Sequence, residues 1–189
     1  MKSVIKFSML VALIMGATVT FAQTAASEKT VMVGGAAMYP SKNIIENALN
    51  SKDHTTLVAA VKAAGLVETL QGDGLFTVFA PTNAAFDMLP KGTVETLLKP
   101  ENKEMLAGIL TYHVVPGKVS AMQLLEMIKA GNGKAELTTV AGGKLYASLK
   151  GKNVILTDEK GGVATLTVKD VNQKNGVIHV IDHVVLPKS

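Results

Sequence analysis

The hydrophobic pattern changes from mainly helical to mainly strand spacing near Gly133, and this change limits the fold more than any other feature. Before Gly133, most apolar side chains recur every three or four residues, which is the spacing of amphipathic helices. After Gly133 they alternate, which is typical of strands. Helices followed by strands, without repeated strand–helix–strand units, predict an α+β fold with a largely antiparallel β-sheet.

The individual elements follow from this pattern and from capping residues. Ser120, with Gln123 three residues later, forms a capping box, and Gly65 offers a left-handed helix end. Ser41, Asp53 or Thr55, and Thr82 or Asn83 are the cap residues that the sequence offers for three other helices. The predicted helices cover residues 44–49, 57–64, 66–70, 85–89, 93–98, 101–111 and 122–128. The predicted strands cover residues 75–80, 113–115, 137–140, 144–149, 153–157, 164–171 and 177–186.

The first 22 residues are typical of a secretory signal peptide. Lys2 and Lys6 precede an uncharged, mostly apolar run that ends at Thr20 and Ala22, two small residues that suit cleavage after Ala22. The alternative is an uncleaved membrane anchor, but the run is shorter than the roughly 20 apolar residues that span a bilayer. We therefore expect a secreted or periplasmic protein with no membrane span after signal removal.

The rest of the chain divides into a lead-in and one domain. Residues 23–38 are rich in Ala, Gly, Thr and Ser without a clear period, and we expect them to form a flexible lead-in. Residues 39–187 form the predicted domain. With 48% apolar and 18% charged residues, this chain has enough core-forming side chains for one globular unit, which we expect to be a monomer.

Composition also excludes several classes of function. The sequence contains no cysteine, which rules out disulfide scaffolds, catalytic thiols, iron–sulfur clusters and thiolate zinc sites. All 19 basic residues are lysine, and there are only three Tyr and five Phe. The chain therefore lacks the arginine forks that read guanine and has few aromatic rings for base stacking, so nucleic acid is not an expected partner.

Two histidines near the end of the chain, His179 and His183, are four residues apart. On a helix this spacing would suit zinc, but the surrounding β-branched residues predict a strand, in which four residues span roughly 13 Å. One metal ion cannot bridge that distance. We expect polar tips at a strand edge or a buried imidazole bonded to the backbone, and neither a metal nor a cofactor.

Tyr112 and His113 lie where a helical period gives way to a strand. At such a junction each ring can be buried while its polar tip bonds to the backbone, which would join the helix to the sheet. We favour this structural interpretation, and the alternative is that the pair belongs to a contact surface.

Two segments, together with Tyr112 and His113 between them, resemble the fasciclin-like domain family. The segments are 76–86 (FTVFAPTNAAF) and 175–187 (NGVIHVIDHVVLP), and the resemblance runs from about Tyr39 to Pro187. It implies a twisted, largely antiparallel sheet flanked by several short helices, displayed outside the cell as an adhesion or matrix-binding unit and without catalysis. It also implies partner contacts at Tyr112, His113, Asp170 and Val171. Val171 stands where the adhesive animal members carry isoleucine, and His183 also departs from the family pattern, which argues against an integrin-type partner.

Three functions follow from these observations. The first is an exported, non-enzymatic binding module that attaches to a surface or matrix protein or polysaccharide. The second is a periplasmic or secreted carrier of a small apolar ligand, which requires a concave apolar pocket. A hydrolase is the weakest hypothesis, because no nucleophile, base and orienting group can be named together in the sequence.

Overall fold

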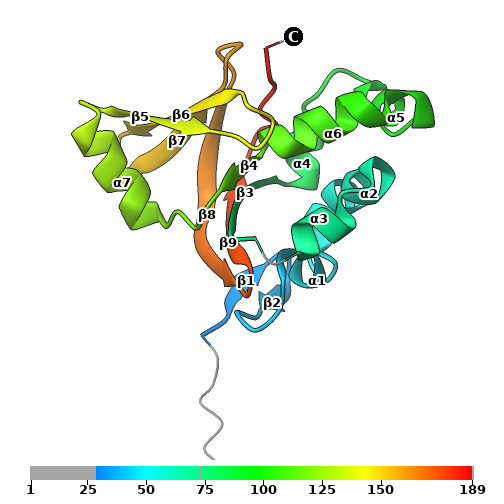
Figure 1. The fold of residues 1–189 in the computed structure, drawn as a ribbon, viewed down its shortest axis with the longest axis horizontal. Helices are drawn as coiled ribbons and strands as arrows, with labels where there is room; N and C mark the ends of the chain where they lie inside the picture. Colours follow the sequence, from blue (N-terminus) through cyan, green and yellow to red (C-terminus); the bar gives the residue numbers. More distant parts are fainter. Residues whose placement is uncertain (1–28, 73, 189) are drawn as a thin grey trace, which may run out of the picture.

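The computed structural model describes residues 29–72 and 74–188 of the chain (Figure 1). The predicted signal peptide and residues 23–28 of the predicted lead-in lie outside the described residues. The helices are α1 (Ile44–Ala48), α2 (Thr55–Ala64), α3 (Val67–Gln71), α4 (Asn83–Asp87), α5 (Thr93–Leu97), α6 (Lys103–Tyr112) and α7 (Ala121–Ala130). The strands are β1 (Val31–Val33), β2 (Ala36–Met38), β3 (Phe76–Pro81), β4 (Val114–Pro116), β5 (Lys134–Thr138), β6 (Lys144–Lys150), β7 (Asn153–Thr157), β8 (Val163–Gln173) and β9 (Gly176–Ile181).

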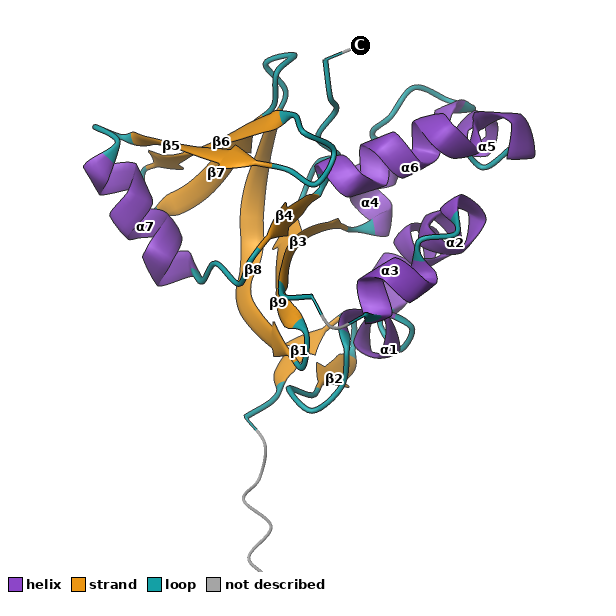
Figure 2. Cartoon of the chain, viewed as in Figure 1, coloured by secondary structure: helices purple, strands orange, loops and turns teal. Residues whose placement is uncertain are grey.

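Seven of these strands form one twisted sheet in the order β4-β3-β9-β8-β7-β6-β5 (Figure 2). Neighbouring strands run antiparallel, except that β3 and β9 are parallel and paired from Phe76↔Gly176 to Pro81↔Ile181. The two ends of the sheet approach each other, because the N–H of Val140, after β5, donates to the carbonyl of Val114 in β4 at 2.8 Å. The structure therefore confirms the α+β fold with a largely antiparallel sheet, curled so far that it nearly closes.

The helices lie on two sides of this curled sheet (Figure 1). Helices α1 to α6 gather on one side of β3 and β9, where Leu57, Val61 and Ile178 belong to one apolar core. Helix α7 lies on the other side against β5 and β6, and its Leu124 and Ile128 belong to a second core. The centre of the sheet thus separates two cores, and β9 is buried along its whole length.

Most of the predicted helix ends match the structure. Ser120 and Gln123 form the capping box of α7, Thr82 caps α4, and Gly65 ends α2 with a left-handed φ of 73°. The start of α1 differs, because Asn43 rather than Ser41 is the cap. The Asn43 side chain accepts the Glu46 N–H at 2.9 Å, and the Glu46 carboxylate accepts the Asn43 N–H at 2.8 Å. Helix α2 begins after His54 without a side-chain cap, so neither Asp53 nor Thr55 has the role we expected.

Residues 31–38, which we expected to belong to a flexible lead-in, form the β1–β2 hairpin instead. Gly34 and Gly35 both have positive φ values, 57° and 76°, which is the geometry of a two-residue hairpin turn. The side chains of Val33 and Met38 are buried in the core beneath α1. The packed unit therefore begins upstream of the predicted boundary at Tyr39. The strands have three residues each, too few to show a period in the sequence.

We expect Met38→Ala to lower the free energy of unfolding by about 2–5 kcal/mol, because it removes a core side chain that is only 3% exposed. Met32→Ala is the matched control in the same hairpin, since Met32 is 63% exposed and its loss should change stability by less than about 0.5 kcal/mol. Urea unfolding measures both. Equal, small effects of the two substitutions would show that the hairpin is not part of the packed unit.

Candidate functional site

Tyr112, the last residue of α6, is completely buried and joins this helix to the far part of the sheet. Its hydroxyl donates to the Lys144 carbonyl of β6 at 2.6 Å and accepts the Glu159 N–H at 3.3 Å. Burial raises the pKa of Tyr112 to about 12, so the phenol stays neutral at physiological pH. Gly143 lies against the ring, where an added Cβ would come within 2.6 Å of it. Glycine at position 143 therefore leaves the space that the Tyr112 ring occupies.

His113 holds the C-terminal segment, residues 182–188, against α6. Its Nδ1–H donates to the Ile109 carbonyl at 2.8 Å, and its Nε2 accepts the Val185 N–H at 3.2 Å. Accepting at one nitrogen and donating at the other requires the neutral ring. Burial lowers the pKa of His113 to about 4, in agreement with these bonds.

Asp170 and His179 form a second junction, between β8, β9 and the start of α7. Asp170 has a φ of 57°, in an irregular stretch of β8, and its carboxylate accepts the Ala121 N–H at 2.7 Å. The Asp170 N–H donates to His179 Nδ1 at 3.3 Å, and His179 Nε2–H donates to the Val119 carbonyl at 2.9 Å. Burial lowers the pKa of His179. Both ring nitrogens are therefore used by the backbone.

The structure separates His179 from His183. His179 lies inside β9 and is buried, as one of the two sequence interpretations required, whereas His183 follows the end of the strand, is exposed and pairs with Asp182 at 2.8 Å. Within residues 29–72 and 74–188, no group of three or more His, Asp or Glu side chains is arranged to hold a metal ion.

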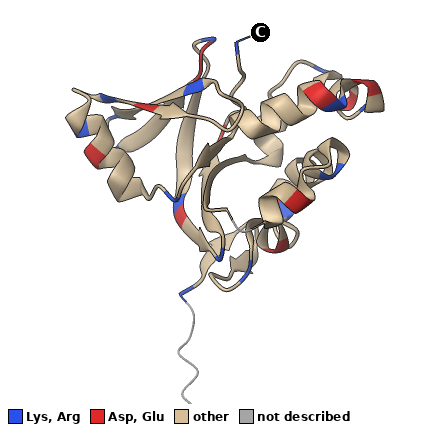
Figure 3. Cartoon of the chain, in the orientation of Figure 1, with Lys and Arg blue, Asp and Glu red and all other residues tan. Residues whose placement is uncertain are grey.

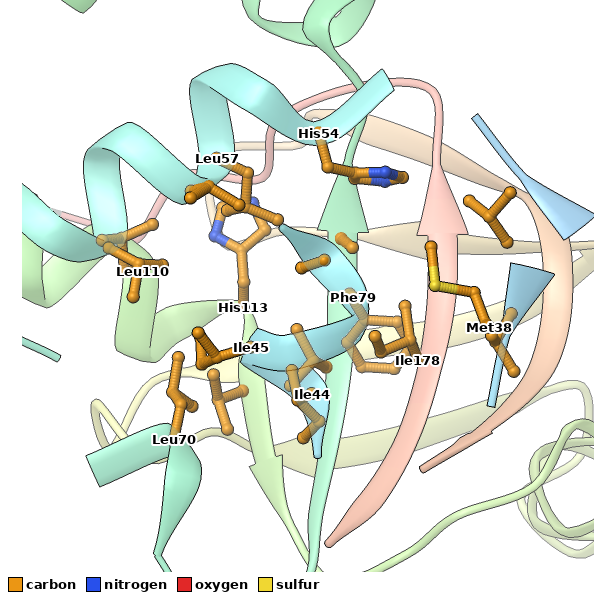
Figure 4. Close-up of a pocket in the computed structure, with 18 residues that line it drawn as sticks. Met38, Ile44, Ile45, His54, Leu57, Leu70, Phe79, Leu110, His113 and Ile178 are labelled. Carbon is orange, nitrogen blue, oxygen red and sulfur yellow. The ribbon is translucent and has the colours of Figure 1, made fainter. Parts of the chain in front are cut away.

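An apolar cavity of about 40 Å³ lies between the helices and the central strands (Figure 4). Its lining comes from β1, β2, α1, α2, α3, β3, α6, β4, β8 and β9. It also includes His54, just before α2, and His113, just after α6 (Figure 4). His54 is buried, and its Nδ1 lies 2.9 Å from the Ser51 hydroxyl. Burial lowers the pKa of His54, although the Ala80 backbone and the charge of Asp53 oppose the shift. The cavity has room for about one water-sized group.

A larger groove of about 280 Å³ opens on the other side of His113. One wall consists of α4, α5 and α6, and the other is the C-terminal segment at Val184 and Leu186. Leu110 and His113 line both the groove and the cavity, so these two side chains separate them. Lys160, in the β7–β8 loop, stands at the groove.

Of the four sequence-predicted contact residues, three are interior. Tyr112, His113 and Val171 are 0%, 2% and 1% exposed, so their side chains cannot touch a partner while the fold is closed. His113 and Val171 meet at the cavity, whereas Tyr112 lies in the second core. Asp170 is half-buried and stays a candidate for contact. Both rings are buried with their polar atoms bonded to the backbone, as the structural interpretation of this pair predicted.

Sequence reasoning missed two residues that shape these sites. His54 follows the polar run Ser51–Asp53, which looks like a solvated turn, and no periodicity reveals that its ring is buried. Asp158 precedes Gly161 and Gly162, a pattern that is typical of a solvated charge beside a turn. It is buried, and it accepts the N–H groups of Lys160 and Gly162 and that of Leu186 in the C-terminal segment. The glycines that follow Asp158 indicated a tight turn but not this long-range bond.

The outer face of β5 to β8 is the broad surface that these buried residues support. On these strands the inward side chains are buried and the outward ones are half-buried or exposed. The outward set crosses the sheet in register, with Tyr146 opposite Glu136 and Thr157, and the Lys134 ammonium 3.8 Å from the centre of the Tyr146 ring. Figure 3 shows that charges are scattered over helices, loops and strands, including the interior of β8. No helix in the described part of the chain has the length and apolar character needed to cross a bilayer.

Comparison with known proteins identifies relatives of the whole fold. The family model described as "Fasciclin domain" matches residues 52–187. The protein named sll1483 from Synechocystis sp. is 49% identical over 170 residues, which cover 90% of this chain and 87% of that protein. Human periostin is 32% identical over 137 residues, or 72% of this chain and 15% of periostin.

A solved structure agrees with the sequence comparisons. The FAS1 domain pair from the insect cell adhesion molecule fasciclin I superposes with a TM-score of 0.69 at 16% sequence identity. The match covers 78% of this chain and 52% of that one. It therefore supports the FAS1 fold.

We expect the free energy of unfolding to fall as the pH is lowered from about 6.5 to about 4. Unfolded histidine binds a proton near pH 6.5, but folded His113 does so only near pH 4, so protons favour the unfolded state within this window. His113 alone would cost up to about 3 kcal/mol across it, and His54 and His179 act in the same direction. Urea unfolding at several pH values measures the slope.

His113→Gln separates this contribution from the titration of carboxylates. A glutamine amide can offer an acceptor and a donor but does not titrate, so the variant should lose less stability between pH 7 and pH 4.5 than the parent. Met122→Gln, at an exposed position of α7, introduces the same side chain without removing a titrating group and should keep the slope of the parent. Identical slopes for the parent and His113→Gln would contradict the neutral, buried state of His113.

Proposed function

The chain belongs to the fasciclin domain family, and from this premise we propose that it is an exported, non-enzymatic module that binds a surface or matrix protein or polysaccharide. Export is supported by the signal-like first 22 residues. Adhesion is supported by the family resemblance, since such domains are usually displayed outside the cell. The structural match, a protein described as an insect cell adhesion molecule, is in keeping with this role.

One observation supports binding rather than catalysis: most polar side chains of the family motifs form hydrogen bonds within the fold. Tyr112, His113 and His179 are buried, and each makes two hydrogen bonds to backbone groups. Catalysis needs a nucleophile and a base that can reach a substrate. These groups instead connect α6, β6, β9 and the C-terminal segment, which makes the domain a rigid support for its surface.

We place the contact surface on the outer face of β5 to β8, together with Asp170 on the same long strand. This face offers an aromatic ring at Tyr146, a hydroxyl at Thr157 and paired charges at Lys144 and Glu136, which are 2.8 Å apart. Aromatic rings combined with adaptable polar groups are typical of recognition surfaces. Asp170 adds a carboxylate whose position is fixed by its bond to the start of α7.

Capture of surface polysaccharide and matrix fractions by the immobilised protein tests this placement. We expect Tyr146→Ala to reduce capture at least fivefold, because it removes the ring at the centre of the face. Tyr39→Ala is the matched control, since Tyr39 is an exposed tyrosine next to β2 and away from this face. Capture unchanged by Tyr146→Ala, in a variant that still unfolds cooperatively, would reject the outer face.

Asp170→Asn tests the second part of the surface. Asparagine tolerates a positive φ and keeps an oxygen for the Ala121 N–H, so the fold should be retained while the negative charge is lost. A loss of capture would assign contact to the charge of Asp170. Unchanged capture would leave Asp170 with a structural role alone.

A second candidate function is a carrier of a small ligand, and the groove between α6 and the C-terminal segment favours it. Its volume of about 280 Å³ is close to the lower end of ligand sites, which run from about 300 to 1,000 Å³. We expect native mass spectrometry of protein purified from its own source to show a discrete added mass that denaturation removes. A mass equal to that of the bare chain would contradict this function.

A further inference from the structure

The groove has a fixed wall and a closed floor. The C-terminal segment forms the wall through three side-chain acceptors: His113 holds the Val185 N–H, Asp158 the Leu186 N–H at 2.9 Å, and Glu159 the Lys188 N–H at 3.2 Å. Leu110 and His113 close the floor against the internal cavity. The described residues that line the groove are apolar except for Thr93, His113 and Lys160.

Lys160 is the one residue with a full charge at neutral pH among the described residues that line this groove. The neighbouring acids do not neutralise it directly. Both oxygens of Asp158 and both of Glu159 accept backbone N–H groups, and no described carboxylate lies within salt-bridge distance of the Lys160 ammonium. An apolar groove with one available cation at its rim is complementary to a ligand with an apolar body and one negative charge.

We propose that the groove binds a small anionic amphiphile, an unbranched carboxylic acid of about eight to ten carbons, with its carboxylate at Lys160 and its chain against Ile109 and Val184. The length follows from the volume, since 280 Å³ holds about nine groups of the size of a water molecule, about 30 Å³ each. This inference rests on the carrier function proposed above and names its ligand class.

Titration of the purified chain with octanoate, and with 1-octanol as the neutral counterpart, tests the proposal. Calorimetry gives the affinities, and amide chemical shifts locate the site. We expect octanoate to bind with a Kd of about 0.1–1 mM, as suits a ligand of this size, and to shift the amides of Ile109, Lys160 and Val184. Octanol should bind more weakly. Affinity should stop rising beyond about ten carbons, because Leu110 and His113 close the floor.

Two pairs of variants separate the charge from the apolar groove. Lys160→Gln should weaken octanoate binding about three- to fivefold and leave octanol unchanged, whereas Lys152→Gln, at an exposed lysine in the β6–β7 turn, should change neither. Thr93→Phe fills the groove from α5 and should weaken both ligands at least tenfold. Thr96→Phe, on the same helix but outside the lining, is its control.

The outcomes distinguish failure of this inference from failure of the carrier function. Equal affinity for octanoate and octanol, or no effect of Lys160→Gln, would overturn the anionic ligand class while leaving a neutral ligand in the groove. Amide chemical shifts confined to the outer sheet face would show that octanoate does not bind in the groove. Association of two copies of the chain that blocks octanoate binding would show the same. A source-derived protein without added mass, together with saturable octanoate binding, would reject the carrier function but retain the site.

Discussion

The parallel pairing of β3 with β9 is the contact on which the rest of the structure depends. It joins residues 76–81 to residues 176–181, about a hundred positions later, and both strands contribute to the two cores. Gly176 permits the pairing, because a Cβ there would collide with the Phe76 carbonyl. Asn175, just before β9, accepts the Ile44 N–H at 3.0 Å and donates to the Leu70 carbonyl at 2.6 Å, which fixes α1 and α3 to the same strand end. The start of β9 therefore fixes the positions of α1 and α3, which come much earlier in the sequence.

Buried histidines solve a problem that this topology creates. Backbone groups remain to be paired in the last turn of α6, before α7, in the irregular stretch of β8 and after β9, and leaving them unpaired would be costly. His113 and His179 each bridge two such groups as neutral rings. The same rings that resemble catalytic or metal-binding groups in the sequence are therefore committed to the fold. The surfaces that we propose for function are the outer sheet face and the groove.

The sequence predicts the helices and strands better than the contacts between them. Alternation after Gly133 identifies all five C-terminal strands, and Ser120 with Gln123 identifies the start of α7, because both signals are local. The β1–β2 hairpin was missed because three-residue strands show no period. In the candidate site, the burial of Tyr112 and His113 could be anticipated from their position at a helix–strand junction. The groove could not, because its wall depends on Asp158 and Leu186, whose contact spans 28 residues and has no pattern.

The way the C-terminal segment is attached determines how the domain responds to tension. Asp182 still bonds to Thr165 of β8, but after it the segment is held by the side chains of His113, Asp158 and Glu159 and by the burial of Val185 in the second core. The described N-terminal end and the C-terminus lie at opposite ends of the molecule (Figure 1). A load on the C-terminal end would have to break these bonds and withdraw Val185 from the second core before it reached β9. Tension on this end would therefore act first on the wall of the groove and only then on the central strand pair.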